Sequence, residues 1–244
     1  MIRSNELFIK LIRFNREKIE NYDIYPFNIE IIKNFNELRL TSPVTFLVGE
    51  NGVGKSTFIE AIAMASGLNP EGGTQNFSFS TFDDYSNLYK YLRISKFGIP
   101  KTKFFLRAES FYNVATNIDE NRDNGPLNLS YGGSLHECSH GESFIQLIQK
   151  RFTDHGLYIL DEPEAALSPS RQMALLCLID DLVKQGSQFI IATHSPILIA
   201  YNKGKILNLN DDFKEIRLED TDIYNTYKEF LNNPYGMQKI LFNE

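Results

Sequence analysis

The second half of the chain alternates short runs of apolar residues with longer segments in which apolar residues recur every three or four positions. A continuous apolar run of four or five residues predicts a strand buried on both faces, and the longer recurrence predicts a helix with one buried stripe. These patterns predict strands at 157–160, 188–192 and 205–208, and helices at 142–151 and 168–185. Strands that alternate with helices indicate a largely parallel sheet covered on both faces, so the predicted fold class is α/β.

The first half of the chain is less regular. A buried strand is predicted at 44–48, and a glycine-rich turn separates it from a helix at 56–66. Residues 27–33 and 38–40 predict two short strands around a turn, and residues 103–114 predict another strand. Residues 115–133 are rich in Asn, Asp and Gly, which predicts a loop.

The turn after the strand at 44–48 carries the clearest chemical signal. Its sequence from Gly49 to Thr57, GENGVGKST, matches the phosphate-binding pattern GxxxxGKS between a strand and a helix. Glycines let several backbone N–H groups converge on one point, and the helix N-terminus adds positive potential there. Lys55 would contact the β- and γ-phosphates, and the Ser56 hydroxyl would bind Mg²⁺. The expected phosphate-binding residues are Asn51, Gly52, Val53, Gly54, Lys55, Ser56 and Thr57.

Two acidic residues directly follow the buried strand at 157–160. Asp161 and Glu162 therefore emerge where the carboxyl ends of parallel strands form a ligand crevice. Asp161 would hold Mg²⁺, directly or through water, and Glu162 would polarise an attacking water as general base. An acidic turn that merely ends a strand is the alternative, and the nearby phosphate loop argues against it.

A histidine follows the buried strand at 188–192, in the sequence ATHS. His194 could donate a hydrogen bond to the γ-phosphate or to the attacking water. A single histidine after a strand is more often structural, so both interpretations stay open on the sequence alone.

The three motifs GENGVGKST, YILDEPEAALSP and ATHS together resemble the ABC ATPase superfamily, in particular its soluble SMC-like and RecF-like branch of small bacterial AAA-family ATPases. The resemblance implies a P-loop ATPase domain that binds ATP and Mg²⁺, hydrolyses ATP to ADP and phosphate, and forms an ATP-dependent homodimer in the cytoplasm. It also implies a single domain, 1–244, with a core lobe at about 1–70 and 152–244 and an inserted signature lobe at about 71–151. Between Lys55 and Ser139 lie only 83 residues, too few for the long coiled coil of chromosome-organising relatives.

The family signature, ordinarily LSGGQ, has a partial counterpart before the helix at 142–151. Ser139 and Gly141 match the pattern, whereas Cys138, His140 and Glu142 replace its Leu, first Gly and Gln. The resemblance implies that Ser139, His140, Gly141 and Glu142 act on the ATP of the opposite subunit. No arginine finger is expected near the phosphate loop to neutralise the γ-phosphate, so this signature would supply the missing stabilisation. A simple helix cap by Ser139, with Glu142 completing a capping box, is compatible with the same residues.

Two further family elements are less distinct. Ala166, Leu167 and Ser168 occupy the place of the D-loop, which crosses the dimer interface in the family, although Ser168 before Pro169 is also an ordinary helix start. Gln75 is a candidate for the metal-contacting glutamine of the Q-loop, but it follows Lys55 by only 20 residues. An exposed loop glutamine is the alternative.

The amino-acid composition limits the classes of partner that the chain could bind. The net charge of −6 argues against a general nucleic-acid coat, and the two cysteines have neither disulfide nor metal spacing, which fits a reducing cytoplasm. No apolar run is long enough to insert in a membrane. Residues 87–107 hold six cations and no acid, interleaved with aromatic residues, which indicates a surface for nucleic acid or an acidic protein partner. A solvated helix face followed by an edge strand is the alternative.

Three functions are compatible with these motifs. The first is a soluble ATPase that closes as a dimer around ATP, with DNA maintenance or phage defence as its setting by family analogy alone. The second is the ATPase subunit of a membrane transporter, and the third is an ATP sensor that does not hydrolyse its ligand. The sequence DEPEAALSP resembles the soluble branch, and the acidic pair together with His194 favours hydrolysis.

Overall fold

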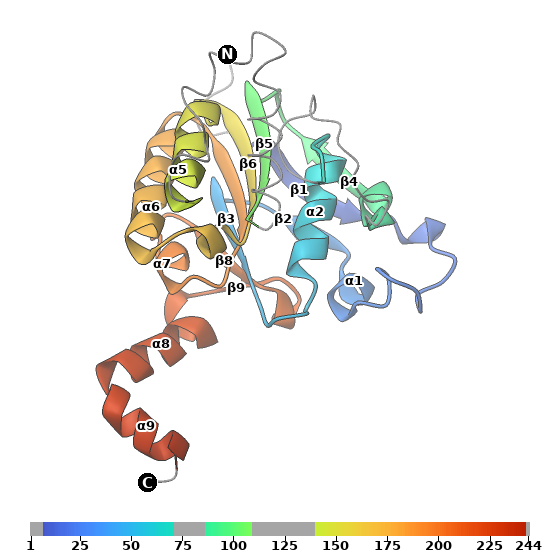
Figure 1. Ribbon diagram of the computed structural model, residues 1–244. Coiled ribbons are helices and arrows are strands. Elements are labelled where there is room, and N and C mark those ends of the chain that lie inside the picture. Colours follow the sequence, from blue (N-terminus) through green and yellow to red (C-terminus); the bar gives the residue numbers. More distant parts are fainter. Residues whose placement is uncertain (1–6, 71–85, 109–139, 243–244) are drawn as a thin grey trace.

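The computed structural model describes residues 7–70, 86–108 and 140–242, and it places helices on both faces of a central sheet (Figure 1). The sheet has the strand order β5-β6-β7-β3-β8-β9, in which the first five strands are parallel and β9 is antiparallel to β8. Its strands are β3 (Val44–Val48), β5 (Thr102–Arg107), β6 (Gly156–Asp161), β7 (Gln188–Ala192), β8 (Lys205–Asn208) and β9 (Lys214–Ile216). The predicted α/β class with a mostly parallel sheet is confirmed.

The central strands are buried on both faces, as the apolar runs predict. Every residue of β3, β6 and β7 is buried. Side chains along β6 alternate between two separate cores, since Ile159 belongs to one cluster while Tyr158 and Leu160 belong to the other. Burial on both faces fixes the register of these strands, and thereby the height at which each strand ends.

The main helices cover the two faces unequally. Helices α5, α6 and α7 pack on one face, whereas α2 lies on the opposite face with a second, smaller sheet (Figure 1). These helices are α2 (Lys55–Ala65), α5 (His140–Arg151), α6 (Pro169–Lys184) and α7 (Pro196–Ile199). The helices predicted at 56–66, 142–151 and 168–185 therefore begin and end within about two residues of the observed ones.

The smaller sheet is antiparallel and has the strand order β2-β1-β4. It consists of β1 (Ile9–Phe14), β2 (Glu37–Arg39) and β4 (Leu92–Lys96), and the 3₁₀ helix Asn87–Tyr91 precedes β4. The buried side chain of Gln188 connects this sheet to the main one. Its amide nitrogen donates to the Ile9 carbonyl oxygen at 2.9 Å, and its amide oxygen accepts from the Ile9 backbone nitrogen at 2.9 Å.

The strand expected at residues 27–33 is wrong, because this segment contains the short helix α1 (Glu30–Asn34). Its apolar residues alternate like those of a strand, yet the same residues also satisfy helical spacing. Phe27 and Ile31 are four positions apart, Ile32 and Phe35 are three apart, and all four are buried in one core. Burial against α2 and the smaller sheet therefore selects the helix.

Two strands from the segment expected to form the inserted lobe, β4 and β5, pair with strands of the core. The predicted strand at 103–114 corresponds to β5, which ends at Arg107. The predicted loop at 115–133 lies outside the described residues.

The last two helices, α8 (Asp222–Asn232) and α9 (Pro234–Phe242), extend away from the sheets (Figure 1). No residue of either helix is buried. The remaining short 3₁₀ helices of the described residues are Arg16–Lys18, Pro163–Ala166, Leu209–Asp211 and Leu218–Asp220. None of the described helices is long and apolar enough to cross a membrane.

Candidate functional site

The glycine-rich loop joins β3 to α2, as the sequence predicts. Gly52 and Gly54 have φ angles of +80° and +106°, a backbone conformation that glycine adopts without strain. A side chain at Gly54 would also place its Cβ 2.9 Å from the Ile29 Cγ2 atom. Both the backbone conformation and the close packing against α1 therefore require glycine at this position.

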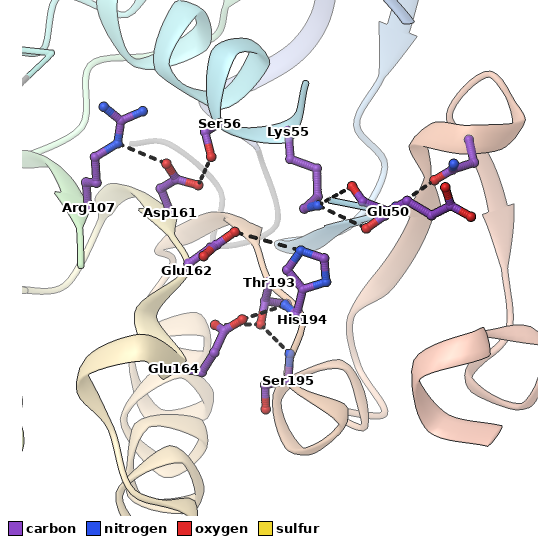
Figure 2. Close-up of polar contacts among 12 residues, drawn as sticks. Glu50, Lys55, Ser56, Arg107, Asp161, Glu162, Glu164, Thr193, His194 and Ser195 are labelled. Atoms are coloured by element: carbon purple, nitrogen blue, oxygen red, sulfur yellow. Dashed lines mark hydrogen bonds and ion pairs between the residues drawn. The ribbon is translucent and has the colours of Figure 1, made fainter. Parts of the chain in front are cut away.

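Lys55 is the first residue of α2 and reaches back across the loop. Its Nζ donates to the carbonyl oxygens of Gly49 at 2.9 Å and Glu50 at 2.8 Å (Figure 2). Burial lowers the pKa of Lys55, while the carboxylates of Glu162 and Asp161 oppose this shift. The ammonium group thus lies within the loop, bonded to backbone oxygens that phosphate oxygens could replace.

Asp161 ends β6 directly beside the start of α2. Its Oδ1 accepts from the Ser56 Oγ at 3.2 Å, and its Oδ2 accepts from the Arg107 Nε at 3.0 Å (Figure 2). The Ser56 hydroxyl and the Asp161 carboxylate therefore place two oxygen atoms that could coordinate a metal ion next to each other. Mg²⁺ commonly takes one or two protein oxygens and completes its shell with waters and phosphates, so this pair fits Mg²⁺. Within the described residues, no group of three or more His, Cys, Asp or Glu side chains forms a metal site made of protein alone.

Arg107 is the residue that the sequence interpretation misplaced. Besides Asp161, it forms an ion pair with Glu60 of α2, with 3.1 Å between Arg107 Nη1 and Glu60 Oε2. Burial raises the pKa values of both Glu60 and Asp161, and the Arg107 guanidinium opposes each shift. The sequence places Arg107 only in the cationic stretch at 87–107, whereas the structure brings it beside Asp161, because β5 and β6 are neighbours and Arg107 ends β5 opposite Asp161. Its guanidinium pairs with carboxylates, so the absence of an arginine finger for the γ-phosphate stays a prediction.

The cationic stretch at 87–107 is consequently not one free surface. Lys101 forms an ion pair with Asp154, Lys103 donates to the Ser66 carbonyl oxygen at 3.0 Å, and Arg107 belongs to the site just described. The exposed cations that remain are Lys90, Arg93 and Lys96. The stretch contains a 3₁₀ helix, the edge strand β4 of the smaller sheet, and β5. This arrangement is close to the alternative interpretation of the stretch, a solvated helix face followed by an edge strand.

Glu162 directly follows Asp161 at the end of β6, and His194 follows the end of β7. The two side chains face each other, with 3.8 Å between Glu162 Oε1 and His194 Nε2 (Figure 2). Glu162 has a left-handed backbone (φ +49°) and a side chain that is 39% exposed, so its carboxylate is open to water. The His194 Nε2 atom is buried and has no hydrogen-bond partner among the described residues. Burial and the charge of Lys55 lower the pKa of His194, which favours the neutral imidazole.

An unpaired buried nitrogen beside an exposed carboxylate fits a site that takes a ligand. Buried polar groups in proteins are normally bonded, so an exception calls for a partner that arrives later. A phosphate oxygen or a water bonded to the Glu162 carboxylate would supply one for His194.

Glu164 is a second residue that the sequence interpretation missed. It lies in the 3₁₀ helix Pro163–Ala166, and its carboxylate bonds to the segment that carries His194 (Figure 2). The acidic run DEPE contains this residue, but nothing in the run distinguishes Glu164 from a solvated acid. Only the fold shows that Glu164 is partly buried and bonded to this segment.

The D-loop candidates follow Glu164 directly. Ala166 ends the 3₁₀ helix, Leu167 is buried, and Ser168 precedes α6. The Ser168 side chain makes no capping bond to the helix; its Oγ lies 3.1 Å from the Ser170 Oγ. Pro169 is the first residue of α6, as expected for a helix start.

The signature candidates lie at the limit of what the structure describes. Ser139 and Gln75 fall outside the described residues. The helix predicted at 142–151 is observed from His140, the first described residue of this segment, so His140 and Gly141 lie in the first turn of α5 and not before it. The exposed Glu142 forms an ion pair with Arg171 of α6 at 3.0 Å. A role for these residues across a dimer stays a prediction.

The loop, the oxygen pair of Ser56 and Asp161, and the open pair of Glu162 and His194 meet at the carboxyl ends of adjacent strands. This arrangement defines a P-loop nucleotide-binding domain. Residues 101–199 match the AAA ATPase domain family, and residues 44–130 match an AAA domain family whose description names the AbiEii toxin of a type IV toxin–antitoxin system.

Curated relatives agree with this class. The chain is 26% identical over 203 residues to the vitamin B12 import ATP-binding protein of Photobacterium profundum, a match that covers 74% of this chain and 79% of that protein. It is 24% identical over 200 residues to an energy-coupling factor transporter ATP-binding protein of Methanospirillum hungatei, covering 72% of this chain and 48% of that protein. The chain thus spans about half the length of the second relative.

Solved structures with a related chain course include a metal-chelate type ABC transporter in an inward-facing conformation, with a TM-score of 0.49 and 18% identity over 91% of this chain and 88% of that one. Another is an ATP-binding cassette of an ABC transporter in its ADP conformation, with a TM-score of 0.42 and 17% identity over 78% of this chain and 90% of that one.

These matches to AAA ATPase domain families and to ATP-binding proteins support the predicted resemblance to the ABC-type P-loop ATPase superfamily and the binding of ATP.

Proposed function

We propose that this chain hydrolyses ATP to ADP and phosphate with Mg²⁺, and that two copies close around two ATP molecules. The observation that carries the hydrolysis proposal is the pair formed by Glu162 and His194. An exposed carboxylate lies 3.8 Å from a buried, unpartnered imidazole nitrogen, both beside the phosphate loop. A pure binding site needs the loop and Lys55, but it has no use for a base open to water.

Each side chain has a distinct role in this proposal. Lys55 binds the β- and γ-phosphate oxygens in place of the backbone carbonyls it now contacts. Ser56 and Asp161 hold Mg²⁺, which when bound neutralises charge that builds up on the phosphates. Glu162 accepts a hydrogen bond from the attacking water and takes its proton. His194 bonds the γ-phosphate or that water and thereby fixes its direction of attack.

The proposed dimer completes the site with residues from a second copy. Ser139, His140, Gly141 and Glu142 would approach the γ-phosphate from the partner subunit, and Ala166, Leu167 and Ser168 would cross the interface. The start of α5 supports this proposal, since a helix N-terminus provides unpaired N–H groups for an anion. With two-fold symmetry, each subunit gives one half of each of two equivalent sites.

The transporter subunit is the second candidate, and the relatives favour it, because both curated proteins described above are named as transporter ATP-binding proteins. The description of the matched AAA family, which names the AbiEii toxin, favours a role in a toxin–antitoxin system instead. Hydrolysis by the isolated chain, without any membrane protein, supports the self-contained dimer. Stable co-purification with a membrane protein would support the transporter role. For either candidate we propose a cytoplasmic location, which the cysteine usage supports.

The Glu162→Gln variant tests hydrolysis. We expect its phosphate release to fall by about 100-fold or more, the scale of a lost general base, while ATP affinity stays near that of the wild type. Glu229→Gln, on an exposed position of α8, is the control and should hydrolyse ATP normally. Wild-type turnover in Glu162→Gln would show that Glu162 is not the base. Tight ATP binding without hydrolysis in the wild type would favour the sensor.

A further inference from the structure

The segments that follow β6 and β7 are joined by side-chain hydrogen bonds in addition to the sheet. The first segment contains Glu164, and the second contains Thr193 and His194. The Glu164 Oε1 accepts from the His194 backbone nitrogen at 2.5 Å, and its Oε2 accepts from the Thr193 Oγ1 at 2.7 Å (Figure 2). One carboxylate therefore holds two consecutive residues of the loop that carries the imidazole.

A second buried side chain joins the same two segments. The Gln172 Nε2 donates to the Leu167 carbonyl oxygen at 3.0 Å, and its Oε1 accepts from the Ser195 Oγ at 2.5 Å. Ser195 in turn caps α7 and donates its backbone N–H to the Thr193 Oγ1 at 2.9 Å. The loop around His194 thus has partners on both of its flanks.

A carboxylate at this place is costly for folding. Burial raises the pKa of Glu164, and the neighbouring Glu162 carboxylate acts in the same direction. The two bonds from His194 and Thr193 oppose the shift and satisfy the acid. A neutral side chain of similar size would avoid the cost of a buried charge, so stability gives a weak reason for a glutamate here.

We infer that Glu164 is a positioning residue, which fixes the backbone of His194 so that the imidazole faces Glu162. This inference rests on the proposed function, because the orientation of the His194 imidazole matters only if His194 takes part in ATP hydrolysis. Since a displacement of about 1 Å of a group near the reacting atoms can cost about 100-fold in rate, a bond to the backbone of that group is sufficient to control turnover.

Three variants separate the two bonds of Glu164. Glu164→Leu removes both bonds, and Glu164→Gln retains an acceptor for the His194 N–H. Thr193→Val removes the hydroxyl bond to Glu164 together with the bond from the Ser195 N–H. We expect kcat to fall by about 10- to 100-fold in Glu164→Leu and by less in the other two. The KM for ATP should change by less than about twofold in all three, because Lys55, Ser56 and Asp161 are untouched.

The deciding measurement is a double-mutant cycle with His194→Ala, read as kcat. If Glu164 acts through His194, Glu164→Leu has no further effect once the imidazole is absent. Amide hydrogen exchange of nucleotide-free protein gives a second readout: residues 193–199 should exchange faster in Glu164→Leu than in Glu164→Gln, with other segments unchanged.

The outcomes are distinguishable. Independent, multiplying losses of kcat in the double variant, or unchanged exchange at 193–199 in Glu164→Leu, would overturn the positioning role. A His194→Ala variant that hydrolyses ATP at the wild-type rate would instead overturn the role of His194 in the proposed function, and the exchange measurement would still decide whether Glu164 holds this loop.

Discussion

The two sides of the phosphate site differ in how many of their polar groups already have partners. On the side of α2 and β5, Asp161 is 3% exposed and bonds to Ser56 and Arg107, and Arg107 also pairs with Glu60. On the side of β7, the Glu162 carboxylate is open to water and the His194 Nε2 has no partner among the described residues. The polar groups of the first side are paired within the protein even before Mg²⁺ binds, and those of the second side are not.

This difference indicates which interactions stabilise the fold and which wait for ligand. A network of buried charges that is fully paired contributes to the folded state, and removal of one member leaves an uncompensated charge. Unpaired groups at a cleft cost stability and are retained for binding or chemistry. We therefore expect substitutions on the side of Asp161 to affect folding as well as Mg²⁺ binding, and substitutions on the side of His194 to affect turnover with little effect on folding.

The largest effect is expected at Lys55, whose ammonium group lies within the loop itself. Lys55→Ala should abolish detectable ATP binding, because no other cation in the loop can offset the phosphate charge. Isothermal titration calorimetry measures this directly. Lys103→Ala is the matched control, since Lys103 is also a partly buried lysine bonded to a backbone carbonyl but lies outside the loop. Wild-type affinity for ATP in Lys55→Ala would show that the loop is not the phosphate-binding site.

The next effect concerns the paired side. Arg107→Gln should lower the free energy of unfolding by about 3 kcal/mol, because it leaves Asp161 and Glu60 as buried acids without their cation. The double variant Glu60→Gln/Arg107→Gln should recover part of this loss, since position 60 is then neutral and only Asp161 lacks its cation. Glu162→Gln and His194→Ala should each change the same quantity by less than about 1 kcal/mol. Chemical denaturation in the absence of nucleotide gives all four values, and equal losses on both sides would remove the distinction.

The smallest effect is the pH dependence of the open side. Because the pKa of folded His194 lies below its ordinary value of about 6.5, the unfolded chain binds more protons in the window between the two values. The contribution of His194 to the unfolding free energy is therefore present above about pH 6.5 and is lost as the pH falls through that window. His194→Gln removes this contribution, so the variant should gain stability relative to the wild type on going from pH 7.5 to pH 5.5. A difference between the two proteins that does not change with pH would contradict the lowered pKa.

The sequence predicted those parts of the fold and site that depend on short segments. The strands at 44–48 and 188–192 are continuous apolar runs, and the loop with Lys55 is one uninterrupted motif. Arg107 and Glu164 were missed because their partners are distant in sequence: Arg107 is 54 residues from Asp161, and Glu164 is 30 residues from His194. Such pairs become visible only when the strand order is known.

The strand prediction for residues 27–33 was wrong for a different reason. Phe27, Ile29 and Ile31 alternate with polar residues as in a strand, but Phe27 and Ile31 also share one face of a helix. A pattern this short fits both periods, and the tertiary contact with α2 decides between them.

The central claim is that ATP joins two copies of this chain through a shared site. Multi-angle light scattering of Glu162→Gln with ATP and Mg²⁺ tests it most directly, because the variant should retain ATP long enough for the closed form to accumulate. The account predicts a mass of twice the 28.1 kDa of the chain with ATP, and a return to 28.1 kDa when ADP replaces it. A variant that remains at 28.1 kDa while intact ATP is bound would contradict the shared-site dimer.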